Sequence, residues 1–362
     1  MSRSIIIYAI TFIISIFFGW VYQNKAKTKI GKFFSFLGMI VPPLFVSTFR
    51  YNVGVDYKNY ELYYNIINFQ SRYSVDVLTF ESGFIFINKI AALLFNSSRG
   101  FFFLSSLTFL LFSFIGIIRY KEKISMPLSI MIFLVFFYSP SFNGIRQLIA
   151  VSIVFFALKY AFEKRIWKYL IFIIIASFFH RTALICLLLY FLVPSSKEKY
   201  KDIDLKFDIV IAFFIILTPF IGSVLKYLQQ FIPLINRYSS YISATGDKNV
   251  YFLLYILPPL LILLLYKKNY LKDDIKNLFY IRLMILQIPF QFLGAYVPFL
   301  DRLSLYVSIS QLITLPRLVN IVSKDNKKII ELFIVLWYIF YYCVVYIYLN
   351  ANGVYPYTFS FS

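Results

Sequence analysis

The stretch Phe101–Ile118, FFFLSSLTFLLFSFIGII, contains eighteen consecutive residues without a single charge. A helix of this length is about 27 Å long, close to the roughly 30 Å thickness of the hydrocarbon core of a bilayer. Similar apolar runs recur along the chain of 362 residues, of which 60% are hydrophobic and 14% are charged, whereas about 25% of the residues of a soluble domain are charged. The sequence therefore excludes a soluble domain and predicts an all-α, polytopic integral membrane protein in a lipid bilayer.

The apolar runs predict about twelve transmembrane helices. They lie at residues 4–22, 33–49, 101–118, 126–139, 144–161, 167–180, 182–194, 207–226, 250–266, 278–298, 303–321 and 329–349. No internal repeat interrupts this series, so residues 1–362 are predicted to form a single integral membrane domain.

Lysine is concentrated in six short connectors between these runs. The connectors are Lys25–Lys32, Arg119–Lys123, Lys159–Lys168, Lys197–Lys206, Lys267–Lys276 and Arg317–Lys328. Positively charged connectors stay in the cytoplasm, so all six are predicted to be cytoplasmic. The first two connectors lie on the same side of the membrane only if one of the apolar runs between them does not cross the membrane. We expect this to be the run near 83–96, which is short and carries Lys89, and which is predicted to be a re-entrant or interfacial segment. Both termini and the loops near 50–82 and 227–249 then face outward.

Arginine is distributed differently from lysine. Of the 24 lysines, 20 lie in the six connectors, but only three of the 12 arginines do. The others include Arg50, Arg72, Arg99, Arg146, Arg181, Arg237 and Arg302 at predicted outer positions. Because a guanidinium binds phosphate or carboxylate through a fixed fork of N–H groups, the outer face is predicted to bind an anion. No solvated basic domain with stacking aromatic residues is present, so nucleic acid is not an expected partner.

The outer loop near 50–82 carries the first group of candidate residues. These are Arg50, Asp56, Tyr57, Tyr60 and Glu81. Gly54 permits a tight turn that would bring Arg50 close to Asp56. Tyrosines at headgroup depth commonly form an interfacial belt, so a purely structural role is open for the two tyrosines. The ionisable residues of the loop favour a function.

The second group begins where Pro140 ends one apolar run. Ser141 or Asn143 is placed to cap the next helix, and Arg146 and Gln147 fall in its first turn. A helix N-terminus with free N–H groups and an arginine is suited to an anion. The alternative for Arg146 is that its side chain extends to lipid phosphates.

Three further segments carry candidate residues. Residues 167–194 are predicted to form a tight hairpin with His180, the single histidine, at its outer tip. Histidine is suited to exchange a proton near neutral pH, although a packing role is equally open. Arg302 and Tyr306 lie one helical turn apart at the start of a late run. Arg237 lies in the outer loop 227–249, which is long enough to act as a lid.

Two carboxylate pairs are interpreted as charge-balanced loops. Asp202 and Asp204 have the D-x-D spacing of metal-dependent sugar transferases, and Asp273 and Asp274 are adjacent. Both pairs lie among lysines on the predicted cytoplasmic side, so a metal site is not expected from them.

These segments together resemble the EpsG-like branch of the Wzy-type O-antigen and capsular polysaccharide polymerases. The resemblance covers most of the chain and rests on Arg50–Tyr60 with its core Gly54-Val55-Asp56-Tyr57, on Glu81-Ser82-Gly83-Phe84, on Asn143-Gly144-Ile145-Arg146-Gln147 with Ala150, on Phe179-His180-Arg181-Thr182-Ala183, on Arg302, and on the tail Tyr355-Pro356-Tyr357. The order and spacing of these motifs are more specific than any one of them. Val55 and Arg181 depart from the pattern, where a small polar residue and a lysine are expected.

The resemblance implies a membrane glycosyltransferase of the bacterial cytoplasmic membrane. It would polymerise oligosaccharide repeat units carried on undecaprenyl pyrophosphate into O-antigen of lipopolysaccharide, capsular polysaccharide or exopolysaccharide, with its active site facing the periplasm or the cell exterior. The growing chain would pass from its carrier to the next lipid-linked unit, with release of undecaprenyl pyrophosphate. A flippase and a chain-length regulator would be its protein partners.

Under this hypothesis the candidate residues take three roles. The residues predicted to bind the substrate pyrophosphate are Arg146, Arg302, Arg50 and Arg237, because positive charge is needed where negative charge develops. The predicted catalytic residues are His180, Asp56 and Glu81, one of which deprotonates the acceptor hydroxyl. The predicted supporting residues are Tyr57, Tyr60, Asn143, Gln147 and Tyr306. No cofactor and no metal are expected if arginines stabilise the leaving group.

Three other functions remain open at the level of sequence. A flippase that transports the same lipid-linked unit suits twelve spans, although transporters tend to show paired repeats and polar sites near the midplane. A ligase at the outer face that transfers finished glycan expels the same leaving group. A structural partner in a glycan-synthesis complex would need none of the outer arginines.

Overall fold

The structure is a computed structural model. It describes residues 2–69, 80–194, 220–231, 252–294, 296–298 and 300–360, together with residues 209, 213, 216 and 217. Within these residues every regular element is a helix, and one isolated β-bridge joins Arg50 to Phe359. The prediction of an all-α fold is therefore confirmed.

Contacts within the chain define two compact units. Unit 1 comprises Met1–Tyr160, Arg165–Leu187 and Leu315–Ser362, and unit 2 comprises Ala161–Lys164 and Leu188–Thr314. The single integral domain predicted for residues 1–362 stays a prediction.

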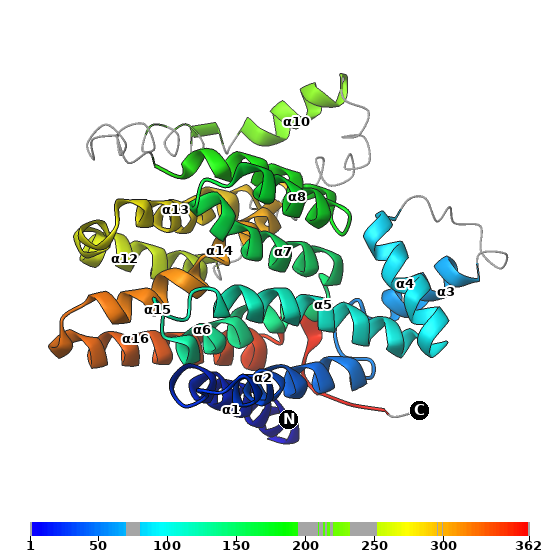
Figure 1. Ribbon diagram of the computed structural model, residues 1–362. Coiled ribbons are helices and arrows are strands. Elements are labelled where there is room, and N and C mark those ends of the chain that lie inside the picture. The colour runs from blue at the N-terminus through cyan, green and yellow to red at the C-terminus, as the bar shows by residue number, and fades with distance from the viewer. Residues whose placement is uncertain are drawn as a thin grey trace. The chain divides into compact units, whose positions relative to one another are not determined.

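Unit 1 contains the helices that carry most of the candidate residues (Figure 1). In chain order they are α1 (Ser2–Asn24), α2 (Lys29–Phe49), α3 (Tyr57–Asn68), α4 (Ser82–Phe95), α5 (Ser98–Ile118), α6 (Met126–Phe133) with the π-helix η3 (Leu134–Tyr138), η4 (Pro140–Phe142), α7 (Ile145–Phe162), α8 (Ile166–Ser177), η5 (Arg181–Leu192), α15 (Gln311–Ile321), α16 (Lys324–Tyr342) with the π-helix η10 (Cys343–Tyr348), and η11 (Ala351–Gly353). The ends of α7 and η5 and the start of α15 belong to unit 2.

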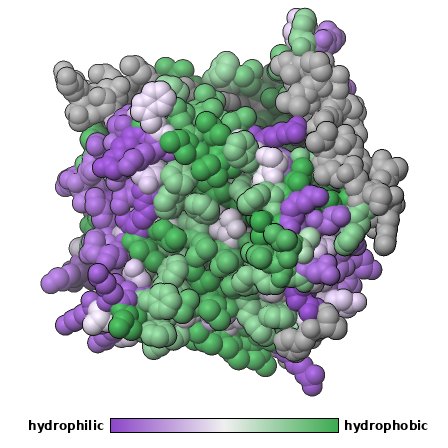
Figure 2. All heavy atoms as spheres, turned by 45° about the vertical axis from the view of Figure 1, so that its right-hand side comes forward, coloured by the Kyte–Doolittle hydropathy of each residue, from purple (hydrophilic) through white to green (hydrophobic). Residues whose placement is uncertain are grey.

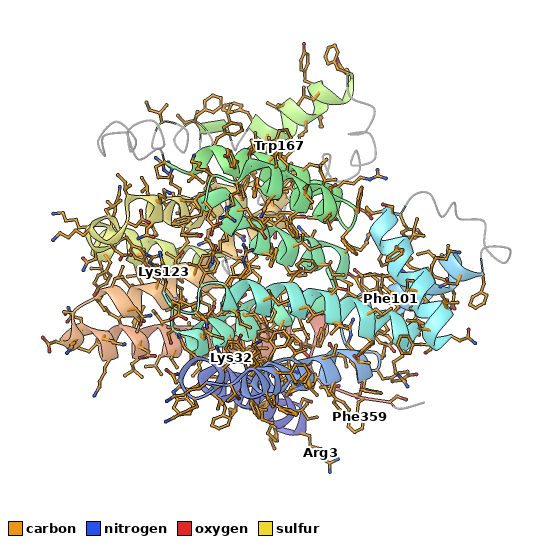
Figure 3. The ribbon with its side chains drawn as sticks, viewed as in Figure 1. Arg3, Lys32, Phe101, Lys123, Trp167 and Phe359 are labelled. Carbon is orange, nitrogen blue, oxygen red and sulfur yellow. The ribbon has the colours of Figure 1, made fainter. Side chains whose placement is uncertain are left out.

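Aromatic side chains fill the contacts between the helices of unit 1. Helix α1 packs against α2 and α6, and α5 packs against α2 and α4. Phe101 of α5, which is labelled in Figure 3, lies against Tyr60 of α3 and Phe84 of α4, with ring centroids 5.9 Å and 5.4 Å away. All three side chains are buried, so the short helices α3 and α4 are held by a common aromatic core.

The helical elements that lie wholly within the described part of unit 2 include α10 (Ile221–Gln229), α12 (Phe252–Asp273), η8 (Ile275–Asn277), α13 (Leu278–Gly294), η9 (Leu300–Ser304) and α14 (Leu305–Ser308). Helix α13 packs against α12, η9 and α14. The buried amide of Gln311 donates a hydrogen bond of 2.8 Å to Gln287, so polar groups in this interior satisfy one another.

Five helices in the described part of the chain are long and apolar enough to cross a membrane. They are α1 from Arg3 onward, α2, α5, α7, and α16 continued through η10 to Tyr348. Large apolar side chains such as Ile13 and Phe17 are 65% and 54% exposed on α1, and hydrophobic side chains cover broad areas of the face in Figure 2. Hydrocarbon accommodates such surfaces and water does not. The protein is therefore a membrane protein, and the number of about twelve spans stays a prediction.

The segment near 83–96 forms the short helix α4. Its 14 residues make it about 21 Å long, less than the thickness of a hydrocarbon core. Lys89 is exposed on it. Its length agrees with a segment that does not cross, and its re-entrant or interfacial location stays a prediction.

Residues 166–192 form the hairpin that the sequence predicted. Helix α8 and the 3₁₀-helix η5 are its two arms, and the hydroxyl of Tyr169 in α8 donates a hydrogen bond to the carbonyl of Cys186 in η5. His180 lies in the turn between the arms. Its position at the tip of the hairpin is confirmed, and the location of that tip on the outer side of the membrane stays a prediction.

The C-terminal tail lies along the turn that follows α2. The backbone N–H of Tyr51 donates to the carbonyl of Thr358 at 2.9 Å, and the N–H of Ser360 donates to the carbonyl of Phe49 at 3.1 Å. Further along, the N–H of Gly54 donates to the carbonyl of Gly353 at 2.9 Å. These bonds join the end of the chain to the loop that carries Asp56.

We predict that Gly54→Ala destabilises this turn. Gly54 has φ +97°, and a Cβ atom there would lie 2.7 Å from Oδ1 of Asn143 and 3.0 Å from Arg50. A left-handed backbone conformation at a residue other than glycine costs about 1–3 kcal/mol, so thermal unfolding of the purified protein in detergent should begin at a lower temperature. Gly144→Ala is the control, because its Cβ would meet only the movable end of Leu148 within 3.4 Å. Equal melting temperatures for the two variants would contradict the prediction.

Candidate functional site

Arg50 directly follows α2 and is almost fully buried, with 3% of its surface exposed. Its guanidinium donates hydrogen bonds of 2.9 Å to the carbonyls of Val53 and Phe142. It also lies 4.4 Å from the ring centroid of Phe142 and 4.8 Å from that of Phe102, distances typical of cation–π contacts. Burial lowers the pKa of Arg50 to about 10, so the side chain is charged near neutral pH. Arg50 joins two loops in this structure, and its predicted contact with pyrophosphate stays a prediction.

Asp56 ends the tight turn that the sequence predicted at Gly54. Its backbone N–H donates to Oδ1 of Asn143 at 3.3 Å, and its carboxylate accepts a hydrogen bond of 3.3 Å from Asn59. The described residues contain no ion pair between Asp56 and Arg50, because Arg50 is turned toward backbone carbonyls. The turn forms as expected, and it places the backbone N–H of Asp56 against the side chain of Asn143. It does not bring the charges of Arg50 and Asp56 into an ion pair.

Tyr60 caps the helix that carries Arg146. Its hydroxyl accepts a hydrogen bond of 3.1 Å from the N–H of Ile145, the first residue of α7, and donates one of 2.6 Å to the carbonyl of Asn143. Burial raises the pKa of Tyr60 to about 12, so the hydroxyl keeps its proton as a donor. The predicted cap by Ser141 or Asn143 is wrong. The side chain of Asn143 instead donates to the carbonyl of Asn352 at 2.9 Å.

The predicted supporting residues Tyr57 and Gln147 are also buried. Tyr57 is 5% exposed and its ring stacks on Phe102 with centroids 4.9 Å apart. Gln147 is 6% exposed in the first turns of α7. Tyr57 and Tyr60 therefore belong to the protein interior in this structure, and the interfacial belt considered for them does not describe their environment.

Glu81, Arg146 and His180 come together although they are far apart in the sequence. Arg146 lies in the first turn of α7, as predicted, and its guanidinium donates a hydrogen bond of 2.6 Å to Oε2 of Glu81. Nδ1 of His180 lies 3.5 Å from Oε1 of the same carboxylate. The exposed fraction of the side chain is 11% for Glu81, 29% for Arg146 and 26% for His180. This group of three residues is called the Glu81 cluster below.

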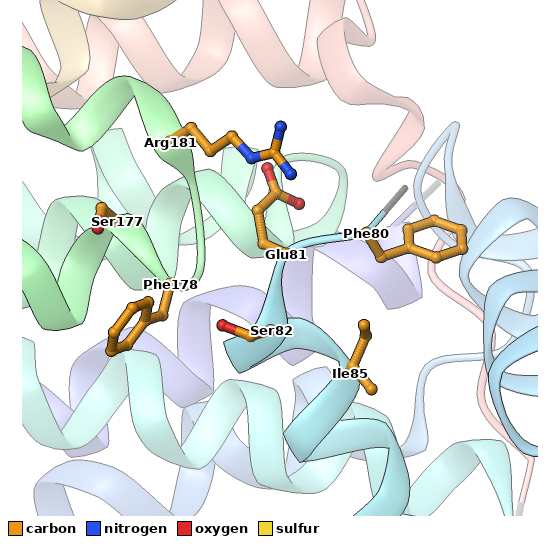
Figure 4. A pocket seen from close by; sticks show the side chains of 7 residues that line it. All are labelled: Phe80, Glu81, Ser82, Ile85, Ser177, Phe178 and Arg181. Carbon is orange, nitrogen blue, oxygen red and sulfur yellow. The ribbon is translucent and has the colours of Figure 1, made fainter. Parts of the chain in front are cut away.

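Gly83 permits the close approach of α4 to the tip of the hairpin. Its N–H donates a hydrogen bond of 2.8 Å to the carbonyl of Phe178, and a Cβ atom at this position would lie 2.8 Å from the same oxygen. Glu81 is the residue that precedes α4, and Figure 4 shows it beside the turn that contains Phe178. Glycine at this position therefore brings Glu81 within reach of His180.

The electrostatics of the cluster favour an ionised Glu81. Burial by itself would raise the pKa of this carboxyl, but the nearby His180 and the charge of Arg146 outweigh burial and lower the pKa from 4.5 to about 2. A carboxylate with so low a pKa is a poor proton acceptor near neutral pH. Nδ1 of His180 faces this carboxylate, so Nε2 is the ring nitrogen on the side away from Glu81.

The other predicted residues do not belong to the described part of unit 1. Arg237, like Arg72 and most of the loop 227–249, lies outside the described residues. Arg302 is exposed in η9 of unit 2, whereas Tyr306 in α14 is 1% exposed. The segment begins as a 3₁₀-helix with about three residues per turn, so the two side chains do not share a face as predicted. Burial raises the pKa of the neighbouring Asp301.

The described carboxylates that resembled a metal pair have a local structural role. Asp274 accepts a hydrogen bond of 2.9 Å from the backbone N–H of Lys276, and Asp273 accepts one of 3.0 Å from the amide of Asn277. They stabilise the start of η8. Asp202 and Asp204 lie outside the described residues. Among the residues described, no three His, Cys, Asp or Glu side chains are grouped to hold a metal ion.

These observations define a class of protein: an all-helical membrane protein with a partly buried arginine–glutamate–histidine cluster where helices end. More specifically, the chain belongs to the EpsG family, whose family model matches residues 33–359. This result confirms the resemblance inferred from the sequence motifs and supports a role in polysaccharide biosynthesis. Searches of the curated proteins and of the solved structures found no significant match.

We predict that Glu81→Gln changes the dependence of stability on pH. The pKa of Glu81 is lower in the folded protein than in an unfolded chain, so its charge stabilises the fold above about pH 4.5, and this stabilisation is lost as the pH falls toward 2. Melting temperatures in detergent should favour the wild type near neutral pH, and the difference should shrink below about pH 4. Glu122→Gln is the control, because 85% of its side chain is exposed. A difference that does not vary with pH would refute the assignment.

Proposed function

We propose that this protein polymerises oligosaccharide repeat units carried on undecaprenyl pyrophosphate, at the outer face of the cytoplasmic membrane. A hydroxyl of the incoming lipid-linked unit attacks the anomeric carbon at the reducing end of the growing chain. The new glycosidic C–O bond forms as the C–O bond to pyrophosphate breaks, and undecaprenyl pyrophosphate leaves. The observation that supports this reaction best is the Glu81 cluster, which combines a proton acceptor and a cation in a membrane protein of the EpsG family.

His180 is the general base in this proposal. It takes the proton of the attacking hydroxyl on Nε2, while Glu81 orients the ring through Nδ1 and stabilises the imidazolium that forms. Glu81 is therefore a positioning residue, because its low pKa disfavours proton uptake. Asp56 remains a second candidate for the base.

Arg146 stabilises the leaving group. One nitrogen of its guanidinium is engaged by Glu81, and a guanidinium has further N–H groups in a fixed fork that can bind phosphate oxygens. Positive charge at this place stabilises the negative charge that develops on the departing pyrophosphate. Arg302, Arg237 and Arg50 assist in the proposal. A flippase that supplies the units and a chain-length regulator are the proposed protein partners.

Deletion of the gene tests the proposed reaction directly. In cells whose flippase and ligase are intact, we expect single repeat units on the surface acceptors and no longer chains, measured by sizing both the lipid-linked glycans and the surface polysaccharide. Repeat units trapped on the cytoplasmic leaflet would instead identify a transporter. Long chains that stay on the lipid carrier would identify a ligase.

We predict that Arg146→Ala slows polymerisation by about one to two orders of magnitude. The estimate follows from the loss of a charge-assisted hydrogen bond, worth about 1.5–3 kcal/mol, in the transition state. The measurement is the rate at which membranes containing the protein release undecaprenyl pyrophosphate, with protein abundance checked in the same membranes. Lys89→Ala, which removes an exposed charge from α4, should keep the wild-type rate. A fully active Arg146→Ala protein would remove Arg146 from the mechanism.

A further inference from the structure

A cavity of about 420 Å³ lies directly beside the Glu81 cluster (Figure 4). Its lining residues come from the start of α4 and from the turn at the tip of the hairpin, and they are Phe80, Glu81, Ser82, Ile85, Ser177, Phe178 and Arg181. Pockets for small ligands commonly measure about 300–1,000 Å³. The cavity therefore has the size of a ligand site and shares a carboxylate with the proposed catalytic group.

The lining combines aromatic rings with hydroxyl groups. Phe80 and Phe178 supply flat apolar surface, and Phe178 is 50% exposed. Ser82 and Ser177 supply polar atoms, and the Ser177 hydroxyl, which donates to the carbonyl of Ile174 at 2.7 Å, can still accept a hydrogen bond. A pyranose ring presents C–H groups on its faces and hydroxyls on its rim. The lining matches both surfaces of a sugar.

Arg181 gives the cavity a positive charge. Its side chain is exposed, and its guanidinium points toward the carboxylate of Glu81 in Figure 4, yet it forms no ion pair within the part of the chain that is described. Glu81 already forms an ion pair with Arg146 at 2.6 Å. Among the residues that the structure describes, two guanidinium groups thus face one carboxylate, which leaves one excess positive charge beside the cavity.

We propose that this cavity binds one sugar residue of the glycan substrate, and that Arg181 selects a sugar that carries a carboxylate. The inference rests on the proposed function, because it identifies the sugar that is held next to His180. A single carboxylate balances the single excess charge and fits the fork of a guanidinium. Pyrophosphate carries two or more negative charges, so the single excess charge beside the cavity would balance only part of its charge.

Equilibrium binding to the full-length protein in lipid nanodiscs tests the proposal. The probes are digalacturonate and its carboxyl-reduced, neutral counterpart. The wild type should bind digalacturonate at least about tenfold more tightly than the neutral sugar, and Arg181→Gln should remove that preference. Lys89→Gln, which removes one exposed charge from α4 outside the cavity, should keep it. Equal affinities of the wild type for both probes, or an unchanged preference in Arg181→Gln, would overturn the proposal.

The aromatic wall has its own test. Phe178→Ala should weaken binding of both sugars, whereas Phe86→Ala, which is equally aromatic, 64% exposed on α4 and outside the cavity lining, should leave both affinities unchanged. Binding of inorganic pyrophosphate that depends on Arg181, without binding of digalacturonate, would assign the cavity to the lipid carrier and overturn the proposal.

Measuring both sugar binding and release of undecaprenyl pyrophosphate by the wild type distinguishes failure of this inference from failure of the proposed function. Selective binding of digalacturonate by a wild type that releases no undecaprenyl pyrophosphate would support the cavity and refute the polymerase. Polymerisation by the wild type at an acceptor KM that Arg181→Gln leaves unchanged would refute the cavity alone.

Discussion

The carboxylate of Glu81 is the group on which the arrangement of the site depends. It binds Arg146 at 2.6 Å and lies 3.5 Å from His180, so it joins the starts of α4 and α7 to the tip of the hairpin. Only 11% of its side chain is exposed, and a carboxylate so poorly hydrated is stable only beside a compensating charge. The need to compensate the charge of Glu81 therefore holds α4, α7 and the tip of the hairpin together. The same contacts position His180, the proposed base, and Arg146, the proposed anion-binding cation.

Hydrogen bonds between neutral groups position the helix that carries Arg146, and Asn143 is at their centre. Asn143 contacts Tyr60, Asp56 and Asn352, which are 83, 87 and 209 residues away in the sequence. Its carbonyl accepts from Tyr60, whose hydroxyl also satisfies the first N–H of α7. The direction in which α7 presents Arg146 consequently depends on α3 and on the C-terminal tail, and not on a capping residue of its own. This explains why the tail belongs to the site although it contributes none of the reacting groups.

The parts of this arrangement that follow from local rules could be predicted from the sequence. Runs of apolar residues predicted the helices, and a proline before Arg146 predicted its place in a first helical turn. The lysine-rich connectors on both sides of residues 167–194 predicted a hairpin with His180 at its tip. Pairings between distant segments could not be predicted, because they depend on packing. The cap of α7 by Tyr60 overrides the local preference for serine or asparagine. The hydrogen bonds from Arg50 to backbone carbonyls could not be predicted either, because sequence patterning does not distinguish a side chain turned toward carbonyls from one turned toward a carboxylate or a ligand.

The pairing of Arg146 with Glu81 also accounts for the choice of arginine over lysine. A lysine at this position would direct its single ammonium group at the carboxylate of Glu81. An incoming phosphate would then have to compete with Glu81 for that ammonium group. A guanidinium can keep Glu81 on one nitrogen and offer other N–H groups of the same plane to a second anion. The carboxylate of Glu81 compensates the charge of Arg146 in a partly buried site before substrate binds. In the proposed reaction, the N–H groups that Glu81 does not engage stabilise the leaving group. Orientation in the membrane needs only positive charge, whereas this proposed role needs the shape of the guanidinium, which favours arginine at position 146.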